Sequence, residues 1–472
     1  MPRTKIICTL GPATDQEGIL EQCVEQGMNV ARLNFSHGTH EMQQKRIDRF
    51  REVQRKCKRP LAMLLDTKGP EIRLGTFKDD KVTVKQGQTF VLTTEDVLGD
   101  ETICHVSYAN LPQDVEVGSC ILIDDGLVEL CVEEVRETSI VCRVVNDGVL
   151  SNYKGVNVPG LHLNMPYLSE QDKRDLIFGI NQDFDFVAAS FVRNAKDVKD
   201  LREFLHENEG HGIRIIAKIE NKEGVDNIDE IIEVADGIMI ARGDMGVELP
   251  EEEVPILQKM IIRKSYQAGK IVITATQMLE SMVNNPRPTR AEVTDVANAI
   301  YDGTSAIMLS GETAAGKFPV EAVSTMLKIA ERTEADIDYR ERFFPQIHAE
   351  NPDITDAVCH ATCTTAYSLG ASAVVALTKS GRSVKKLSRY RPAYPILGGT
   401  TSRKVWRQLA MCWGVTPILL EEKTDVLELF SHAVDRGKEA GMLKKDDLAV
   451  ITAGVPIGRS GTTNMMRVVR VE

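Results

Sequence analysis

The sequence predicts an α/β protein built as a (β/α)8 TIM barrel, with an all-β lid domain inserted after strand 3 and a C-terminal α/β domain. Eight apolar runs alternate with helical patterns, and eight strands are what such a barrel needs to close. Short β-rich runs interrupt this alternation, and a second α/β pattern follows the eighth run. We expect the barrel at residues 1–69 and 166–337, the lid at 70–165 and the C-terminal domain at 338–472.

The barrel pattern begins with runs at 5–10, 28–35 and 61–65, separated by helical patterns at 15–26 and 40–56. It resumes after the insertion with strands expected at 184–191, 213–220, 237–244, 270–276 and 305–312. Helices are expected at 170–180, 195–208, 255–268 and 289–301. One further helix is expected between the fifth and sixth strands, where Val225, Ile228, Ile231, Ile232 and Ala235 follow helical spacing.

The inserted segment has the pattern of a small β-sandwich or barrel, with strands expected at 81–84, 89–93, 120–123, 127–133 and 139–145. Because it enters at the carboxyl end of a barrel strand, it is placed to act as a lid. Residues 339–352 indicate a linker or linking helix. Strands at 373–378, 395–397, 415–420, 448–452 and 465–471, with helices between them, predict a doubly wound sheet.

Composition excludes several classes of function. A net charge of −12 argues against nucleic acid as a main partner. No run reaches the ~18 apolar residues of a membrane span, and the N-terminus lacks the apolar core of a signal peptide. The ten cysteines form no Cys-x-x-Cys pair, so we expect reduced thiols in a cytoplasmic protein. Cys359, His360 and Cys363 have metal-ligand chemistry, but their helical surroundings favour a packed helix face.

Charged residues stand where two buried strands end. Lys218 and Glu220 close the fifth run, and Asp244 follows the sixth. The carboxyl ends of parallel strands meet at one mouth of a barrel, so we expect these three side chains to lie together. For any one of them alone, solvent-facing charge is the better explanation, whereas three on adjacent strands favour a site with one cation and two carboxylates able to hold a divalent metal.

Polar residues also follow the other strands. They are Arg32, Asn34, Ser36 and His37 after the second strand, Asp66, Thr67, Lys68 and Arg73 after the third, Arg242 after the sixth, Thr276 after the seventh, and Ser310 and Glu312 after the eighth. Cations and hydroxyls beside metal-binding carboxylates suit a phosphorylated, carboxylate-bearing substrate and phosphoryl transfer. No GxxxxGK[ST] motif is present, which excludes a P-loop enzyme. His37 alone is equally compatible with an ordinary turn.

Eight runs make the sequence similar to the pyruvate kinase family over essentially its whole length. They are RLNFSHG (32–38), LLDTKGPEIR (64–73), KIEN (218–221), ARGDMGVELP (241–250), ATQMLESM (275–282), NPRPTRAE (285–292), DVANA (295–299) and MLSGET (308–313). The resemblance implies a glycolytic enzyme that transfers the phosphoryl group of phosphoenolpyruvate to ADP, giving pyruvate and ATP. It also implies a homotetramer.

The resemblance further implies roles for the residues at the strand ends. Glu220 and Asp244 would bind Mg²⁺ or Mn²⁺, and Lys218 and Arg32 would contact the transferring phosphoryl group. The backbone of Arg242, Gly243 and Asp244, with the Thr276 hydroxyl, would hold the substrate carboxylate. Thr276 lies near the point of enolate protonation, and a water chain including Ser310 is one candidate donor.

Further implied sites concern a monovalent cation and the nucleotide. Asn34, Ser36, Asp66 and Thr67 match the K⁺ site of the family, and Glu71 is the acid that accompanies K⁺ dependence, so we expect K⁺ activation. Asn34, His37, Arg73 and Lys154 would contact the nucleotide. Lys154 and Asp125 belong to the lid and would reach the site when it closes.

The C-terminal domain contains a candidate effector loop, TKSGRS, formed by Thr378, Lys379, Ser380, Gly381, Arg382 and Ser383. It follows a strand and precedes a helical pattern at 383–390, which fits either a plain turn with a serine cap or a phosphate cradle. The resemblance favours the cradle, closed by Arg459, Ser460 and Gly461. It implies fructose 1,6-bisphosphate as effector; other members respond to AMP or ribose 5-phosphate. With the chain ending at Glu472, we expect no phosphohistidine-type domain.

Two alternatives stay open at this stage. One is a barrel lyase or aldolase acting on phosphoenolpyruvate or pyruvate, which would share the metal carboxylates but not need the lid or nucleotide contacts. The other is a catalytically silent sugar-phosphate sensor, which would have lost the catalytic set, although Arg32, Lys218, Glu220, Asp244 and Thr276 are all present.

Overall fold

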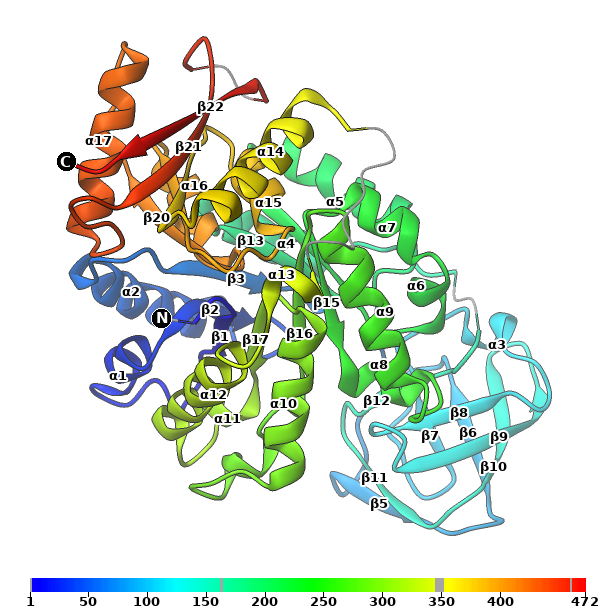
Figure 1. The fold of residues 1–472 in the computed structure, drawn as a ribbon. Helices are drawn as coiled ribbons and strands as arrows, with labels where there is room; N and C mark the ends of the chain where they lie inside the picture. Colours follow the sequence, from blue (N-terminus) through cyan, green and yellow to red (C-terminus); the bar gives the residue numbers. More distant parts are fainter. Residues whose placement is uncertain (1, 162–163, 344–351, 459–460) are drawn as a thin grey trace.

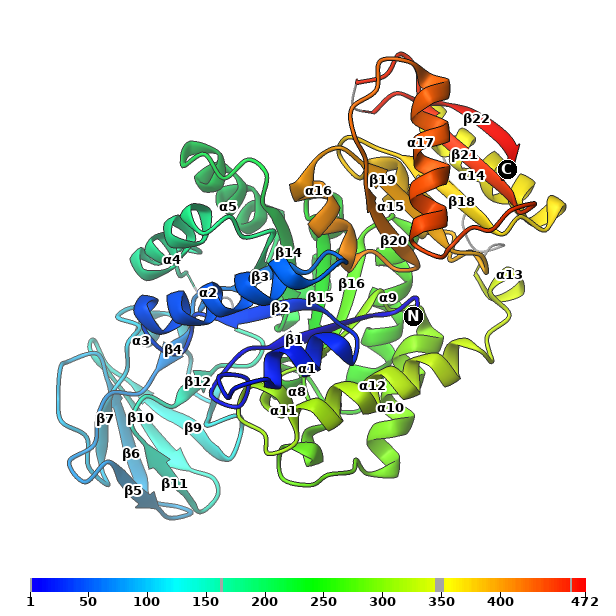
Figure 2. The same ribbon diagram turned by 90° about the vertical axis from the view of Figure 1, so that its left-hand side faces the viewer.

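The structure of the protein, a computed structural model, describes residues 2–161, 164–343, 352–458 and 461–472. Three parts are visible in Figure 1: a central barrel, a β-rich lid and a C-terminal α/β domain. The lid and the C-terminal domain lie at opposite ends of the barrel, as the turned view in Figure 2 also shows.

Eight parallel strands close into the predicted barrel. They are β1 (Lys5–Thr9), β2 (Met28–Asn34), β3 (Ala62–Asp66), β13 (Phe186–Ala189), β14 (Arg214–Ile219), β15 (Gly237–Ala241), β16 (Ile271–Ala275) and β17 (Ala306–Leu309). Their order around the barrel is β1-β17-β16-β15-β14-β13-β3-β2. Nearly every strand residue is buried, because side chains fill the inside and helices cover the outside. The closed barrel confirms the predicted fold class.

Helices connect and cover these strands. They are α1 (Ile19–Glu25), α2 (His40–Lys56), α4 (Glu170–Asn181), α5 (Ala195–Glu207), α6 (Lys222–Asp226), α7 (Ile228–Val234), α8 (Arg242–Glu248), α9 (Val254–Gln267), α10 (Arg290–Asp302), α11 (Gly311–Ala314), α12 (Pro319–Glu334) and α13 (Tyr339–Arg342), with a 3₁₀ turn, η1 (Glu280–Val283). The single helix expected between the fifth and sixth strands is two helices. They meet at Asn227, whose side-chain amide donates to the carbonyl oxygen of Arg193 at 3.0 Å and fixes the break.

The lid departs from the barrel between β3 and α4, as predicted. Its elements are β4 (Ile72–Arg73), β5 (Lys81–Val84), β6 (Thr89–Thr93), β7 (Ile103–His105), α3 (Leu111–Asp114), β8 (Cys120–Ile123), β9 (Val128–Val135), β10 (Ser139–Val144), β11 (Gly148–Ser151) and β12 (Gly155–Asn157). Seven strands form one sheet in the order β4-β12-β8-β9-β10-β6-β7, and β11 pairs with β5. The sequence patterns predicted β5, β6, β8, β9 and β10 but not β4, β7, β11 and β12, which have two to four residues each.

The C-terminal domain holds a five-stranded sheet in the order β20-β19-β18-β21-β22. Its elements are α14 (Ile354–Leu369), β18 (Ala373–Leu377), α15 (Arg382–Ser388), β19 (Ile396–Thr400), α16 (Arg403–Gln408), η3 (Leu409–Met411), β20 (Val415–Leu419), α17 (Val426–Glu439), β21 (Leu448–Gly454) and β22 (Thr463–Arg470). The expectation of helices between all five strands was wrong for the last pair, which is antiparallel. The connection is too short and too rich in glycine and proline to hold a helix.

The barrel and the C-terminal domain share one apolar core, whereas the lid has a core of its own. One core cluster runs from the barrel strands into the C-terminal domain and includes Val374, Leu387 and Trp413 of that domain. The lid has a separate core, which includes Phe90, Ile121 and Leu130. A third cluster covers the other face of the C-terminal sheet. The lid is therefore packed as a unit of its own. The predicted boundaries at 69/70, 165/166 and 337/338 stay a prediction.

No helix in the described ranges has the length and apolar character needed to cross a membrane. The ten cysteines are free thiols, and Cys359 and Cys363 are buried on one face of α14. The described residues contain no group of three or more His, Cys, Asp or Glu side chains arranged to hold a metal ion. The packed helix face predicted for Cys359 and Cys363 is confirmed by their burial.

Candidate active site

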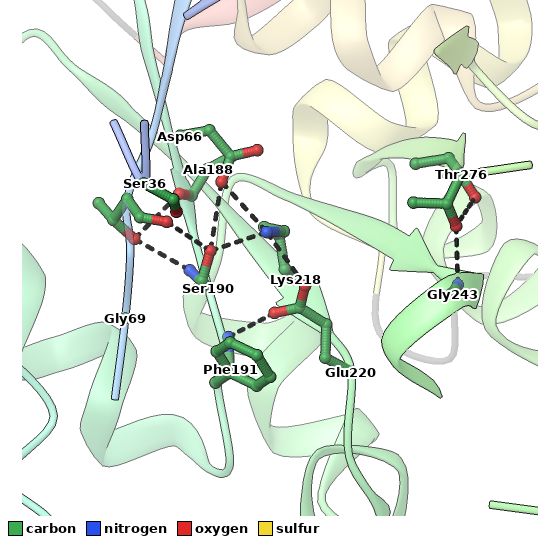
Figure 3. Close-up of polar contacts among 12 residues, drawn as sticks. Ser36, Asp66, Gly69, Ala188, Ser190, Phe191, Lys218, Glu220, Gly243 and Thr276 are labelled. Carbon is green, nitrogen blue, oxygen red and sulfur yellow. Dashed lines mark hydrogen bonds and ion pairs between the residues drawn. The ribbon is translucent and has the colours of Figure 1, made fainter. Parts of the chain in front are cut away.

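Lys218 lies at the centre of a buried network at the carboxyl end of β14. Its Nζ is 3.1 Å from Asp66 Oδ1 and 3.0 Å from Glu220 Oε1, as Figure 3 shows. Arg32 Nε lies 2.6 Å from the other carboxylate oxygen of Asp66. Strands β2, β3 and β14 thus bring together charges that are far apart in the sequence, as predicted for strand ends that meet at one mouth.

Ser190 completes this network, and the sequence analysis did not single it out. Lys218 Nζ donates to Ser190 Oγ at 2.7 Å, and Ser190 Oγ donates to the carbonyl oxygen of Thr67 at 2.7 Å. A Cβ atom on Gly69 would stand 2.9 Å from Ser190 Cβ, and Gly69 has a φ of +75°. The glycine is therefore required both for its backbone conformation and for the close approach to Ser190.

Burial and charge together set the protonation of the network. Burial alone would lower the pKa of the Lys218 ammonium, but the carboxylates of Asp66 and Glu220 outweigh it and raise that pKa. Burial would raise the pKa of Asp66, but Arg32 and Lys218 lower it overall. Glu220 differs, because burial, reinforced by the charge of Asp244, raises its pKa to about 8 despite Lys218. Lys218 is thus held as a cation, whereas Glu220 is a carboxylate that a further cation would stabilise.

Glu220 and Asp244 are the two carboxylates predicted to bind a divalent metal. Glu220 Oε2 accepts a hydrogen bond from the backbone nitrogen of Phe191 at 2.6 Å, which fixes its orientation. Asp244 lies in the first turn of α8, directly after β15, and lines the large cleft between barrel and lid. The charge of Asp244 raises the pKa of both Lys218 and Glu220. The metal-binding role of the two carboxylates stays a prediction.

Thr276 and Gly243 form a second, neighbouring group at the ends of β16 and β15. Gly243 N donates to Thr276 Oγ1 at 2.8 Å, as Figure 3 shows. Thr276 has a φ of +63°, which is unusual for a β-branched residue and marks a strained position. Arg242 turns away from the mouth to pair with Asp295 at 2.7 Å and to donate to the carbonyl oxygen of Thr276. Its side chain therefore braces the loop that carries Thr276.

A cleft of ≈ 640 Å³ separates the barrel from the lid. His37, Arg73, Lys154 and Asp244 line it, together with Asp125. Arg32 and Lys218 do not line it, being only 9% exposed. The cleft is of the size that small-molecule sites have. Its residues come from both the barrel and the lid, so a ligand there would contact both.

Two lid-side cations of the cleft are already paired. Arg73 Nη2 lies 2.6 Å from Glu71 Oε2, and Lys154 Nζ lies 2.8 Å from Asp124 Oδ1. Burial and the charge of Asp244 raise the pKa of Asp125 in the same cleft. This accumulation of carboxylates favours a bound cation or a cationic partner when the lid approaches the barrel.

The other candidates occupy the same mouth with different partners. Asn34 Oδ1 accepts a hydrogen bond from the backbone nitrogen of Ser36 at 3.0 Å. Thr67 Oγ1 donates to the carbonyl oxygen of Ala188 at 3.3 Å. Ser310 follows β17, and its backbone nitrogen donates to Glu312 Oε2 at 2.7 Å. Their roles stay predictions.

The candidate effector loop lies between β18 and α15. Gly381 N donates to Thr378 Oγ1 at 2.9 Å, and Gly381 has a φ of +84°. The loop lines a small pocket of ≈ 30 Å³ together with Gly461, and Lys379 Nζ donates to the carbonyl oxygen of Gly458 at 3.2 Å. The helix that follows begins at Arg382, one residue before the prediction. Arg459 and Ser460 lie outside the described residues.

The fold and this site define a class of protein: a lidded (β/α)8-barrel enzyme whose mouth carries cations and carboxylates suited to a small phosphorylated acid. A family model described as the pyruvate kinase barrel domain matches residues 1–323, and one for the pyruvate kinase alpha/beta domain matches residues 356–469. The chain belongs to the pyruvate kinase family, whose members are phosphotransferases. This assignment favours a kinase over the lyase and sensor alternatives.

The similarity to known pyruvate kinases extends over 99–100% of this chain. A pyruvate kinase of Clostridium acetobutylicum is 50% identical, with 100% of both chains covered. A pyruvate kinase of Geobacillus stearothermophilus is 50% identical over 99% of this chain and 80% of the relative. The crystal structure of a pyruvate kinase from Cryptosporidium parvum superimposes with a TM-score of 0.95 at 38% identity, covering 100% of this chain and 96% of that one.

Proposed function

We propose that this chain transfers the phosphoryl group of phosphoenolpyruvate to ADP, giving pyruvate and ATP. The observation that carries the proposal is the buried Lys218, held as a cation between Asp66 and Glu220 at the mouth of the barrel. A fixed positive charge in a water-poor site stabilises negative charge that develops during phosphoryl transfer. Arg32, anchored on Asp66, would add a second cation at the same point.

The substrate carboxylate would be held by the start of α8. Backbone amides of Arg242, Gly243 and Asp244 stand at the amino end of this helix, where backbone N–H groups have no intrahelical acceptor. Gly243 N donates to the Thr276 hydroxyl, which would share the substrate carboxylate with these amides. Thr276, with a water chain including Ser310, would supply the proton that converts the enolate to pyruvate.

The carboxylates at the mouth fit a divalent metal. Glu220 and Asp244 supply hard oxygen atoms, and the charge of Asp244 helps to raise the pKa of Glu220, which a cation between them would reverse. They would hold Mg²⁺ or Mn²⁺, which, when bound, offsets charge on the phosphoryl oxygens. Two protein carboxylates form an incomplete shell, which leaves room for substrate oxygens and water.

The same mouth fits a monovalent cation. Asn34, Ser36, Asp66 and Thr67 offer hard oxygen atoms at the ends of β2 and β3. These donors support K⁺ activation, because a monovalent cation prefers hard oxygen ligands. Glu71, which pairs with Arg73 at the edge of the cleft, keeps an acid at the position associated with K⁺ dependence in the family.

The nucleotide would lie in the cleft between barrel and lid. Asn34, His37, Arg73 and Lys154 would contact it, and closure of the lid would bring Lys154 and Asp125 toward the phosphates.

At the other end of the molecule, TKSGRS with Arg459, Ser460 and Gly461 would bind fructose 1,6-bisphosphate or another phosphorylated effector. A small pocket lined by Lys379, Ser380 and Gly461 marks the place of this proposed site. A homotetramer would be the regulated form.

The test is pyruvate formation from phosphoenolpyruvate with Mg²⁺, measured with and without ADP, in K⁺ and in Na⁺, with and without fructose 1,6-bisphosphate. We expect turnover that requires ADP and Mg²⁺, is faster in K⁺, and responds to the sugar phosphate. Pyruvate released equally without ADP would replace the kinase with a phosphatase or lyase. Equal rates in K⁺ and Na⁺ would overturn the monovalent site alone, and no response to the sugar phosphate would overturn the effector assignment alone.

A further inference from the structure

Two half-buried cysteines stand directly opposite each other in the lid. Cys120 begins β8, Cys131 lies in β9, and the two are paired residues of an antiparallel ladder. The backbone nitrogen of Val132 donates to the carbonyl oxygen of Ser119 at 3.0 Å. Hydrogen-bonded and non-hydrogen-bonded pairs alternate along such a ladder, so Cys120 and Cys131 occupy a non-hydrogen-bonded pair.

This position brings two cysteines into the range that a disulfide requires. Opposed Cα atoms at a non-hydrogen-bonded pair are about 4.5 Å apart, and disulfides span Cα separations of about 4.4–6.8 Å. Both side chains point to the outer face of the sheet, because the alternate residues Ile121 and Val132 face the buried lid core. A small reagent can therefore reach the pair without unfolding the domain.

The other cysteines do not offer this geometry. Seven of the ten are buried, and the third half-exposed thiol, Cys57, ends α2 on the barrel. In the lid, burial and the neighbouring Glu129 raise the pKa of Cys120 to about 11, and Cys131 adds to the effect. Cys120 is therefore a slow first nucleophile at neutral pH, which leaves Cys131 to react first with a disulfide reagent.

We propose that Cys120 and Cys131 form a redox-reactive dithiol in the lid, which closes to a disulfide by exchange with a low-molecular-weight disulfide such as oxidised glutathione. The Cys131 thiolate attacks one sulfur of the reagent, forming a mixed disulfide and releasing one glutathione thiolate, which takes a proton. The Cys120 thiolate then attacks the Cys131 sulfur and releases the second glutathione. The protein loses two electrons and two protons, and the reagent gains them as two thiols.

The bond would stiffen a hairpin that reaches the cleft. The turn between β8 and β9 carries Asp124 and Asp125, both of which line the cleft, and Asp124 pairs with Lys154. Strand β8 also pairs with β12, whose Asn157 donates to Glu248 of the barrel at 3.0 Å. The dithiol thus lies at the far end of the hairpin from the cleft, where it acts on the lid without touching a proposed site residue.

Peptide mapping of the full-length native protein tests the proposal. The protein is treated with oxidised glutathione, quenched with acid, alkylated and digested with a protease that cleaves before aspartate. Asp124 and Asp125 lie between the two cysteines, so cleavage there separates Cys120 from Cys131 unless a disulfide joins them. The peptide with Cys131 also carries Cys142, which is alkylated. We expect a cross-linked peptide pair two hydrogens lighter than the sum of the same two peptides with Cys120 and Cys131 as thiols, lost on reduction with dithiothreitol.

Three variants give the test its controls. C57S should leave the cross-link intact, whereas C120S should abolish it and leave Cys131 as a stable glutathione adduct. C131S should leave Cys120 mostly as a free thiol. In the parent protein, hydrogen exchange of the β8–β9 hairpin should slow by roughly tenfold on oxidation. The proposal is overturned if Cys57 takes up glutathione while Cys120 and Cys131 stay free thiols or each carry a separate glutathione.

Discussion

Lys218 illustrates how a single residue depends on its surroundings for chemistry. A buried ammonium group is costly unless carboxylates compensate it, and here Asp66 and Glu220 do so at 3.1 and 3.0 Å. The result is a cation that keeps its charge at every physiological pH, because the compensation raises its pKa. The carboxylates of Asp66 and Glu220 would otherwise repel an anionic substrate, and the positive charge of Lys218 offsets this repulsion.

Replacing Lys218 with methionine tests this role. We expect kcat for pyruvate formation to fall roughly 100-fold or more, because the charge acts on the transition state. Binding of Mn²⁺, followed by electron paramagnetic resonance, should persist because Glu220 and Asp244 remain. Lys196→Met is the control, since Lys196 is an exposed helix lysine that pairs with Asp200 away from the cleft. A Lys218→Met variant with near-normal kcat would remove Lys218 from the mechanism.

Ser190 is expected to act as a positioning residue. Its hydroxyl joins Lys218, Asp66 and the Thr67 carbonyl, so Ser190→Ala removes one acceptor of the Lys218 ammonium group. A hydrogen bond to a charged group contributes about 1.5–3 kcal/mol, so we expect kcat to fall roughly tenfold or more with a smaller change in KM for ADP. Ser372→Ala, in the C-terminal domain, is the control. Equal loss in both variants would point to general destabilisation instead.

The sequence predicted the charged members of the site but missed Ser190 for a physical reason. Lys218, Glu220 and Asp244 stand in or directly after apolar runs, and a buried strand cannot hold a charge without a partner. These residues can therefore be recognised from the sequence alone. Ser190 ends the run FDFVAASF as a small, neutral residue that fits a buried strand as readily as a site. Only the pairing of β13 with β3 shows that its hydroxyl faces Asp66.

Charged side chains on barrel strands make hydrogen bonds to the C-terminal domain. Strand β1 is one such strand, because Lys5 Nζ donates across the interface to the carbonyl oxygen of Val415 in β20 at 2.8 Å. Burial lowers the pKa of Lys5 from 10.5 to about 8. The ammonium form is therefore penalised in the folded protein.

This penalty predicts a pH dependence of stability. Between pH 8 and 10.5 the unfolded chain binds more protons at Lys5 than the folded protein, so this residue's contribution to the free energy of unfolding rises with pH, by about 3 kcal/mol at most. Lys5→Met removes the titration. The difference in Tm, variant minus parent, should therefore be largest at pH 7 and fall by a few degrees toward pH 10. A flat profile for Lys5→Met would contradict the assignment.

Strand β14 is a second linking element, since it carries Lys218 at one end and Arg214 at the other. Arg214 Nη2 donates to the carbonyl oxygen of Ser380 in the proposed effector loop at 3.2 Å, and its Nη1 pairs with Asp236 at 3.2 Å. An effector that rearranges this loop would act directly on the amino end of β14. The barrel strand thus connects the two proposed sites through covalent structure and one hydrogen bond.

Arg214→Gln tests this connection. We expect basal kcat to stay within about threefold of the parent, whereas activation by fructose 1,6-bisphosphate should fall by roughly 1 kcal/mol of coupling, about fivefold. Arg202→Gln is a matched control, because Arg202 also pairs with Asp236, at 3.1 Å, and donates to the carbonyl oxygen of Val234 rather than to the effector loop. Equal losses in the two variants would assign the effect to Asp236 and not to the loop contact.

The element pattern was predictable wherever periodicity was strong. The eight barrel strands are buried on both faces and read as continuous apolar runs, so their number and order followed from the sequence. The short strands β4 and β12 of the lid gave no such signal, since two or three residues cannot show a period. The antiparallel hairpin of β21 and β22 was missed because strand direction is decided by the connection and not by the strand residues.

At the scale of the whole molecule, the division of the apolar core decides which parts move together. The barrel and the inner face of the C-terminal domain share one continuous core, whereas the lid has its own. The sequence predicted a lid from its place in the chain, but it could not show which domains share a core. That partition depends on contacts between residues hundreds of positions apart in the sequence, such as Lys5 and Val415.

The separate core predicts that the lid opens and unfolds as an independent cooperative unit. Leu130 is fully buried at the centre of the lid core, and Leu64 is fully buried in β3 of the barrel. Truncation of a buried leucine to alanine costs about 2–5 kcal/mol. Leu130→Ala should therefore speed native-state hydrogen exchange of β8, β9 and β10 by roughly 30-fold or more, while the barrel strands keep their protection.

Leu64→Ala is the matching truncation in the barrel core, and its effect on hydrogen exchange should spare the lid. Because the barrel core continues into the C-terminal domain, this variant should speed exchange in β2 and β3 and also in β18 and β19, with the lid little changed at low denaturant. Faster exchange of the barrel in Leu130→Ala would show that the lid and barrel open as one unit. In that event closure of the lid over the cleft could not occur by rigid-body motion, and the bonds from Asn157 to Glu248 and from Gly69 N to Asp172 Oδ1 would be fixed supports rather than contacts at a hinge.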